Sequence, residues 1–147
     1  MKGFDYELEN VLKLRIEKED NRLFDFARAK QNYDKKLESL KCIEGEIGEM
    51  QELCSDIELK RIDCIKSHYY YLENLRFKQE KSHDLASEAG KACELKRQAY
   101  QNAQVKRKTI ETHKEKQRSA YDMEQKKKEE RMLDEMAVTA FKRKRGL

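Results

Sequence analysis

Apolar residues recur at alternating intervals of four and three along the first half of the chain, and this pattern constrains the fold more than any other feature. From Leu12 to Cys54, nine of the thirteen positions spaced in this way are apolar. Such a repeat forms one apolar stripe along a helix, and the stripe must pack against another helix. A second, weaker stripe runs from Ile65 to Ile110, with nine of fourteen positions apolar. Two stripes in one chain predict a helical hairpin.

The composition agrees with long helices and argues against a compact core. The 147 residues include no proline, only five glycines, 42% charged residues and 37% hydrophobic ones. An ordinary globular domain is about 45–50% apolar and about 25% charged. Most other positions hold good helix formers. We therefore predict an all-α fold, an antiparallel two-helix coiled-coil hairpin with a long C-terminal helical extension, as a single coiled-coil domain over residues 1–147.

The stretch "ELCSDIE" is the best candidate for the turn. Ser55, followed three residues later by Glu58, forms a capping-box motif that is typical of a helix start. We expect a first helix over about 4–53, a turn over about 54–57 and a second helix over about 57–143. Gly45 and Gly48 offer a weaker alternative turn.

A turn near residue 55 pairs residue i with roughly 110 − i. This register sets bulky side chains of the first helix against small ones of the second, as interdigitated packing prefers. It also places Phe4 near Lys106, so that about forty residues of the second helix, or roughly 60 Å, extend past the first helix. The bulky residues are Leu23, Phe24 and Phe26, and the small ones are Ala86, Ala89 and Gly90.

The extension contains an apolar stripe surrounded by basic residues, in the sequence "KKKEERMLDEMAVTAFKRKRG". Most helical stability comes from burying an apolar face, so a stripe without a partner in its own chain predicts a helix that docks on another protein. The alternatives are that the extension frays, or that the turn lies further along and the first helix covers it. The stripe comprises Met132, Leu133, Met136, Ala137, Ala140 and Phe141.

Cysteines and histidines are present, but not at the spacing of a metal site. The sequence also lacks a glycine-rich phosphate loop, an H-E-x-x-H motif and a nucleophile with a plausible base. We therefore expect no enzyme, no cofactor, no metal and no small-molecule substrate. No run approaches the roughly 18–20 apolar residues of a membrane span, so we expect a cytoplasmic protein. The residues concerned are Cys42, Cys54, Cys64, Cys93, His68, His83 and His113.

Both ends of the chain resemble one family. The beginning, "FDYELENVLKLRIEKED", is similar to the N-terminal helix of the flagellar export protein FliJ family. The end resembles the C-terminal motif of the same family, in which Leu-Asp-Glu follows a basic run and precedes an alanine and a basic finish. The matching residues are Phe4, Leu8, Val11, Leu12, Arg15, Glu19, Leu133, Asp134, Glu135, Ala137 and the run from Phe141 to Arg145.

This resemblance implies a central-stalk-like coiled coil of the type III export apparatus, at the cytoplasmic face of the membrane at the flagellar base. Members of the family promote assembly and activity of the export ATPase ring, contact the export-gate membrane protein and bind export chaperones. The resemblance nominates ATPase-binding residues at both ends. They are Phe4, Leu8, Leu12, Leu133, Asp134, Glu135, Met136 and Phe141.

The stretch "HYYYLENLRF" is the densest aromatic cluster of the chain. Three successive tyrosines, 69 to 71, cannot all enter one helical stripe, so at least one should be exposed. They either cover the edge of the stripe or form a binding surface. The resemblance implies that the export-gate contact lies here, and it nominates Tyr71 and Leu75.

Two other functions compete with this interpretation. The basic runs 126–128 and 142–145 could contact phosphates of a nucleic acid. However, acidic residues interleave with them and residues 121–147 carry a net charge of only +2, which disfavours nucleic acid as a partner. A purely structural coiled coil that dimerises through the same stripes is the third possibility.

Overall fold

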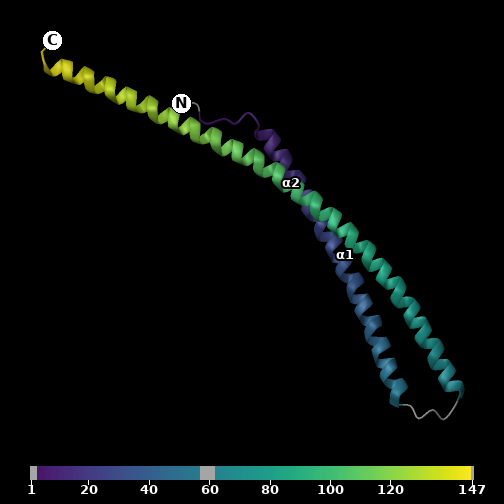
Figure 1. The fold of residues 1–147 in the computed structure, drawn as a ribbon. Coiled ribbons are helices and arrows are strands. Elements are labelled where there is room, and N and C mark those ends of the chain that lie inside the picture. The colour runs from purple at the N-terminus through teal and green to yellow at the C-terminus, as the bar shows by residue number, and fades with distance from the viewer. Residues whose placement is uncertain (1–2, 57–61, 147) are drawn as a thin grey trace. The chain divides into compact units, whose positions relative to one another are not determined.

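A computed structural model describes residues 3–56 and 62–146 of the chain. Within these ranges it contains two helices, α1 (Glu9–Asp56) and α2 (Ile62–Lys144), and no strand. The two long helices pack against each other as a helical hairpin (Figure 1). The prediction of an all-α fold is therefore confirmed.

The helix limits differ from the expected ones at two places. α1 begins at Glu9 rather than near residue 4, and the Glu9 amide donates to the Tyr6 carbonyl oxygen over 3.1 Å at this start. α1 also continues through residues 54–56, which were expected to turn. Ser55 thus lies within α1 and does not begin the second helix, which starts at Ile62. Glu58, the other residue of the expected capping box, lies outside the described residues.

The end of α2 follows the usual chemistry of a helix C-terminus. Lys142, Arg143 and Lys144 lie in its last turn, where positive charge interacts favourably with the helix dipole. Gly146 follows with a φ of 69°, a left-handed conformation that glycine adopts without steric cost. The Gly146 amide donates to the Arg143 carbonyl oxygen over 3.3 Å. These features stop the helix at Lys144.

The chain divides into two compact units, and α2 contributes to both. The terminal unit comprises Met1–Glu19 and Ala103–Leu147, and the hairpin unit comprises Asp20–Asn102. Each unit contains its own contacts between the first and the second half of the chain.

In the hairpin unit, aromatic side chains of α1 pack on α2. The rings of Phe26 and Tyr100 stack with centroids 6.3 Å apart. Gly90 lies so close to Tyr33 that a Cβ added there would be 3.0 Å from the Tyr33 Cε2 atom. The most buried side chain of the unit is Leu75, which is 2% exposed. Other buried residues of this unit are Ile47, Ala86 and Ala89.

The register that we predicted for the hairpin is wrong. A turn near residue 55 would place Phe26 opposite position 84, whereas Phe26 stacks on Tyr100. Gly90 faces Tyr33 and not the bulky cluster around Leu23. The reason is that α1 runs to Asp56 and α2 begins only at Ile62, so the connection lies several residues later than expected.

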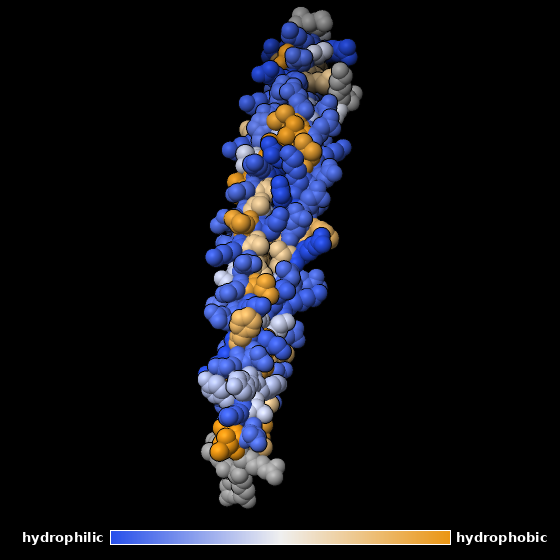
Figure 2. Space-filling model, turned by 90° about the vertical axis from the view of Figure 1, so that its right-hand side faces the viewer, coloured by the Kyte–Doolittle hydropathy of each residue, from blue (hydrophilic) through white to orange (hydrophobic). Residues whose placement is uncertain are grey.

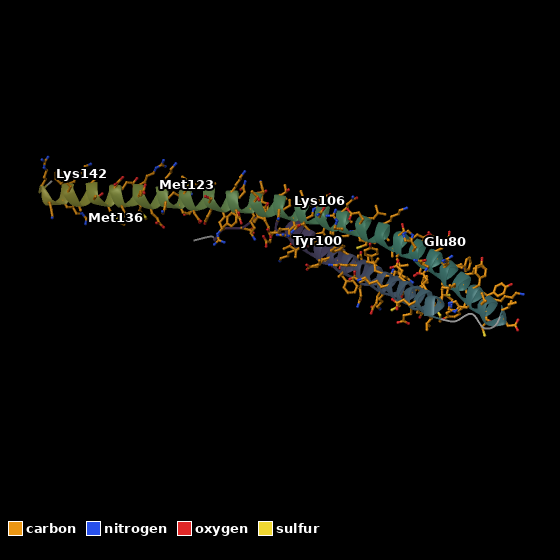
Figure 3. The ribbon with its side chains drawn as sticks, turned by 60° about the horizontal axis from the view of Figure 1, so that its bottom comes forward. Glu80, Tyr100, Lys106, Met123, Met136 and Lys142 are labelled. Atoms are coloured by element: carbon orange, nitrogen blue, oxygen red, sulfur yellow. The ribbon has the colours of Figure 1, made fainter. Side chains whose placement is uncertain are left out.

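The same shift shortens the predicted extension in the terminal unit. Phe4 packs against Tyr121, with ring centroids 5.6 Å apart, and not near Lys106. From there α2 continues to Lys144, and Figure 3 shows Met136 and Lys142 on a stretch with no second helix beside it. The extension therefore exists, but it begins about four helical turns later than predicted.

Candidate partner-binding surface

The N-terminal segment before α1 is attached to α2 through Tyr6. This side chain is 7% exposed. Its hydroxyl donates a hydrogen bond to the Ile110 carbonyl oxygen over 3.4 Å and lies 2.6 Å from His113 Nδ1. A buried tyrosine needs such polar partners, because an unpaired hydroxyl away from water is costly. Tyr6 thus fixes the segment at a defined point of α2.

Phe4 extends this attachment along α2. Its ring is half-buried and lies 6.4 Å from the ring of Tyr6 and 5.6 Å from that of Tyr121. Beside it, Lys114 Nζ is 2.7 Å from a Glu9 carboxylate oxygen and 6.0 Å from the centre of the Tyr6 ring. We call Phe4, Tyr6, His113 and Tyr121 the N-terminal clasp.

A buried ion pair holds α1 to α2 further along the terminal unit. Glu19 is 9% exposed, although it occupies a polar position of the first stripe, and its carboxylate pairs with the Arg107 guanidinium. Arg107 also pairs with Glu111 at 2.5 Å. The carboxylates of Glu111 and Glu19 together raise the pKa of Arg107 above its ordinary value. The guanidinium therefore neutralises a carboxylate that would otherwise be buried unpaired.

From Lys126 onward, the residues of α2 are exposed. Every residue from Lys126 to Gly146, a stretch that we call the tail, is exposed. Its large apolar side chains, such as Leu133 and Phe141, are 64% and 58% exposed. Figure 2 shows hydrophobic side chains scattered among a mostly hydrophilic face, so such residues are not confined to the helix contact. The spacing of Leu133, Met136, Ala137, Ala140 and Phe141 places them on one side of the helix.

The structure places the nominated ATPase-binding residues in different environments. Leu12 is 5% exposed and belongs to the contact between the helices, so its side chain is not accessible to a partner protein. Leu8 is 38% exposed and Phe4 half-buried. The tail residues Asp134, Glu135 and Met136 are exposed together with Leu133 and Phe141. The clasp and the tail candidates share one unit, but Phe4 lies about three helical turns before Leu133.

The three tyrosines of the aromatic cluster in the hairpin unit are all exposed, whereas at least one was expected to be. Tyr69, Tyr70 and Tyr71 are 58%, 63% and 44% exposed. Tyr71 also lines a shallow hollow with His68, whose Nε2 lies 3.1 Å from the Met50 carbonyl oxygen. Leu75, the second residue nominated for the gate, is buried between the helices. Of the two nominated residues, only Tyr71 presents a surface.

Tyr69 gives a local test of this arrangement. Hydrogen bonding to the Glu73 carboxylate and the negative charge of that group raise the pKa of Tyr69 above its ordinary value of 10.0. We expect Glu73→Gln to lower the Tyr69 pKa, because the amide carries no charge that opposes the tyrosinate. Site-resolved NMR titration of the tyrosine ring carbons measures the change. Glu80→Gln is the control, and an equal shift in both variants would contradict the assignment to Glu73.

Sequence reasoning missed the residues of the clasp other than Phe4. Tyr6, His113 and Tyr121 were not singled out, because the N-terminal segment was expected to be helical. A signal was available in "MKGFDY", where a glycine precedes two aromatic residues and an aspartate that favours non-helical conformations.

The described parts of the chain contain neither a cluster of metal ligands nor a helix that could cross a membrane. Among these residues no group of three or more His, Cys, Asp or Glu side chains is arranged to hold a metal ion. Neither α1 nor α2 contains, in its described residues, a window long and apolar enough to cross a membrane. The arrangement instead offers exposed apolar side chains on helices, which suits contacts with another macromolecule.

Comparison with known proteins gives a family assignment. Searches of curated proteins and of solved structures found no match to the chain. A comparison with protein-family models matched residues 4–146 to the model described as flagellar FliJ protein. This match spans nearly the whole chain, including the clasp, the buried ion pair and the tail. The chain therefore belongs to the FliJ family of flagellar proteins.

Proposed function

We propose that this chain is a non-catalytic, stalk-like component of the flagellar type III export apparatus. In this role it promotes assembly and activity of the export ATPase ring, and it links the ring to the export gate and to export chaperones. It acts in the cytoplasm, peripherally associated with the cytoplasmic face of the membrane at the flagellar base. Family membership supports a role related to flagellar export. The exposed apolar stripe of the tail is the observation that supports docking on a partner.

The tail suits docking because its helix is already formed and its apolar side is not covered. A preformed helix loses less conformational entropy on binding than a disordered segment would. An amphipathic helix that enters an apolar groove is a common mode of protein recognition. Leu133, Met136 and Phe141 provide the large side chains for such a contact, and the clasp holds the base of the tail to the N-terminal segment.

Turnover of ATP by the cognate export ATPase, with and without this protein, tests the proposal. We expect the intact chain to stimulate turnover. We expect Leu133→Asp with Phe141→Asp to weaken its apparent affinity for the ring about thirtyfold, since losing central apolar contacts of an interface costs about 2 kcal/mol. The concentration that gives half-maximal stimulation measures this effect.

The hairpin unit provides a matched control. Leu95 and Phe24 are each 68% exposed, so Leu95→Asp with Phe24→Asp makes the same chemical changes away from the tail. These control substitutions should leave stimulation unchanged. Equal loss in both double variants, or no stimulation by an intact folded chain, would remove the support for a tail that docks on the ring.

A further inference from the structure

The tail carries a charge pattern that the proposed function leaves unexplained. Residues spaced seven apart lie along the same edge of a helix. One such row consists of Glu129, Met136 and Arg143. Both rows that flank the apolar centre of the tail have the same order along the helix: an acidic residue, an apolar one and a basic one. The second row consists of Glu130, Ala137 and Lys144.

Between these two rows lies a third, with Leu133 and Ala140. At about 100° per residue, this row lies near the middle of the apolar side and the charged rows lie along its edges. Ala140 is small, so a neighbouring helix can approach closely beside it. The side chains of all three rows are exposed.

In the described part of the chain the charged ends of the rows form no ion pair, although Lys126 precedes Glu129 and Glu130 by three and four residues. Among the described residues, the ion pairs of the terminal unit involve Arg107, Lys114 and Lys128, and none of them includes Glu129, Glu130, Arg143 or Lys144. An acidic end and a basic end about three to four turns apart cannot neutralise each other along one helix. Their natural complement is a helix with the same pattern in the opposite direction.

We propose that the tail pairs with the tail of a second copy of this chain, in antiparallel orientation. In an antiparallel pair each edge row faces its own counterpart, so Glu129 lies opposite Arg143 of the copy, and Met136 opposite Met136. The second row pairs in the same way about a point one residue further along, with Glu130 opposite Lys144 and Ala137 opposite Ala137. The middle row then sets Leu133 against Ala140, large against small.

Pairing centred at residues 136 and 137 satisfies all three rows to within one residue. A parallel pair would instead set the first edge row against the second, with Glu129 against Glu130 and Arg143 against Lys144, which is repulsive. The contact is confined to one stretch of helix, so it belongs with the small interfaces that associate weakly and reversibly. The pairing covers the same apolar stripe that docks on the ring. Self-association and docking therefore exclude each other, and this last point rests on the proposed function.

Sedimentation equilibrium of the full chain tests the pairing. We expect the average mass to rise from monomer to dimer between about 5 and 500 μM, the range of a weak interface. Glu129→Lys and Arg143→Glu should each lower the association constant about tenfold, because each puts like charges at two symmetric positions. The double variant with Glu129→Lys and Arg143→Glu restores opposite charges and should return the constant to within about twofold of the original.

Each other outcome overturns the pairing. A chain that stays monomeric throughout this range would do so, as would a dimer that neither single substitution weakens. A monomer that binds vesicles of phosphatidylglycerol would assign the tail to an anionic lipid surface instead. Circular dichroism checks that these exposed substitutions leave the helices intact. ATP turnover is measured separately. A chain that never dimerises but still stimulates the ATPase would contradict the pairing and leave the proposed function supported.

Discussion

Replacing Leu75 by alanine is expected to lower the free energy of unfolding by about 3 kcal/mol. Leu75 is 2% exposed and is the most completely buried side chain of the described structure. Its loss removes apolar burial and leaves a cavity between two helices that share few other fully buried residues. Urea unfolding followed by far-UV circular dichroism measures the effect.

Tyr71→Ala is the matched control, because Tyr71 lies one turn away and is 44% exposed. We expect it to change the free energy of unfolding by less than about 1 kcal/mol. If the early part of α2 binds the export gate, Tyr71→Ala should weaken that binding while the chain stays folded. Leu75→Ala should weaken it only under conditions in which the variant unfolds. Equal stability of the two variants would contradict the role given to Leu75.

Charge reversal at Arg107 is expected to produce the other large loss of stability. Arg107→Glu brings a third carboxylate beside Glu19 and Glu111, and Glu19 is 9% exposed. A buried carboxylate without a cation is strongly destabilising. The terminal unit should open at the lowest temperature of all the variants considered. Hydrogen exchange of amides near Glu19 and Arg107 measures this local loss.

A variant in which the charges of residues 19 and 107 are exchanged distinguishes the contribution of charge to stability from that of packing. In the variant with Glu19→Arg and Arg107→Glu, the introduced arginine can pair with both Glu111 and the introduced glutamate, so part of the protection should return. Glu111→Gln is the mild comparison, since the Glu111 side chain is 40% exposed. Protection that stays low in the exchanged variant would show that packing around this site matters more than its charges.

The fold class follows from the sequence because the signals for it are long and repeated. Two apolar stripes, the absence of proline and an abundance of helix formers all predict two helices. The register was not predictable in the same way. A heptad stripe offers several alignments that bury apolar residues, and bulky residues such as Phe26 find suitable neighbours in more than one of them. The position of the connection helps to decide among these alignments.

Part of the correct register was nevertheless present in the polar positions of the two stripes. Glu19 and Arg107 each interrupt a stripe, and a buried carboxylate requires a cation across from it. Pairing these two residues gives the alignment that also stacks Phe26 on Tyr100. Interruptions of an apolar pattern can thus specify the alignment better than the pattern itself.

The candidate site was predictable in part for a similar reason. An amphipathic stretch such as 132–141 can be recognised from spacing alone, and the tail is exposed there. Leu12 and Leu75 lie on the two apolar stripes, so their burial was predictable, although the family resemblance nominated both for partner contacts. The clasp depends on a short non-helical segment around Tyr6, whose path is set by its contacts with α2 rather than by local preference.

The clasp divides the terminal unit into an attached part and a projecting part. Phe4 and Tyr6 hold α2 between Ile110 and Tyr121, and everything after that point projects as one helix. Seven residues inserted between the clasp and Leu133 would move the apolar stripe outward by about 10 Å while returning it to nearly the same side of the helix. In such a molecule, insertions and deletions in whole heptads would adjust the depth of contact with a partner without redesigning either contact.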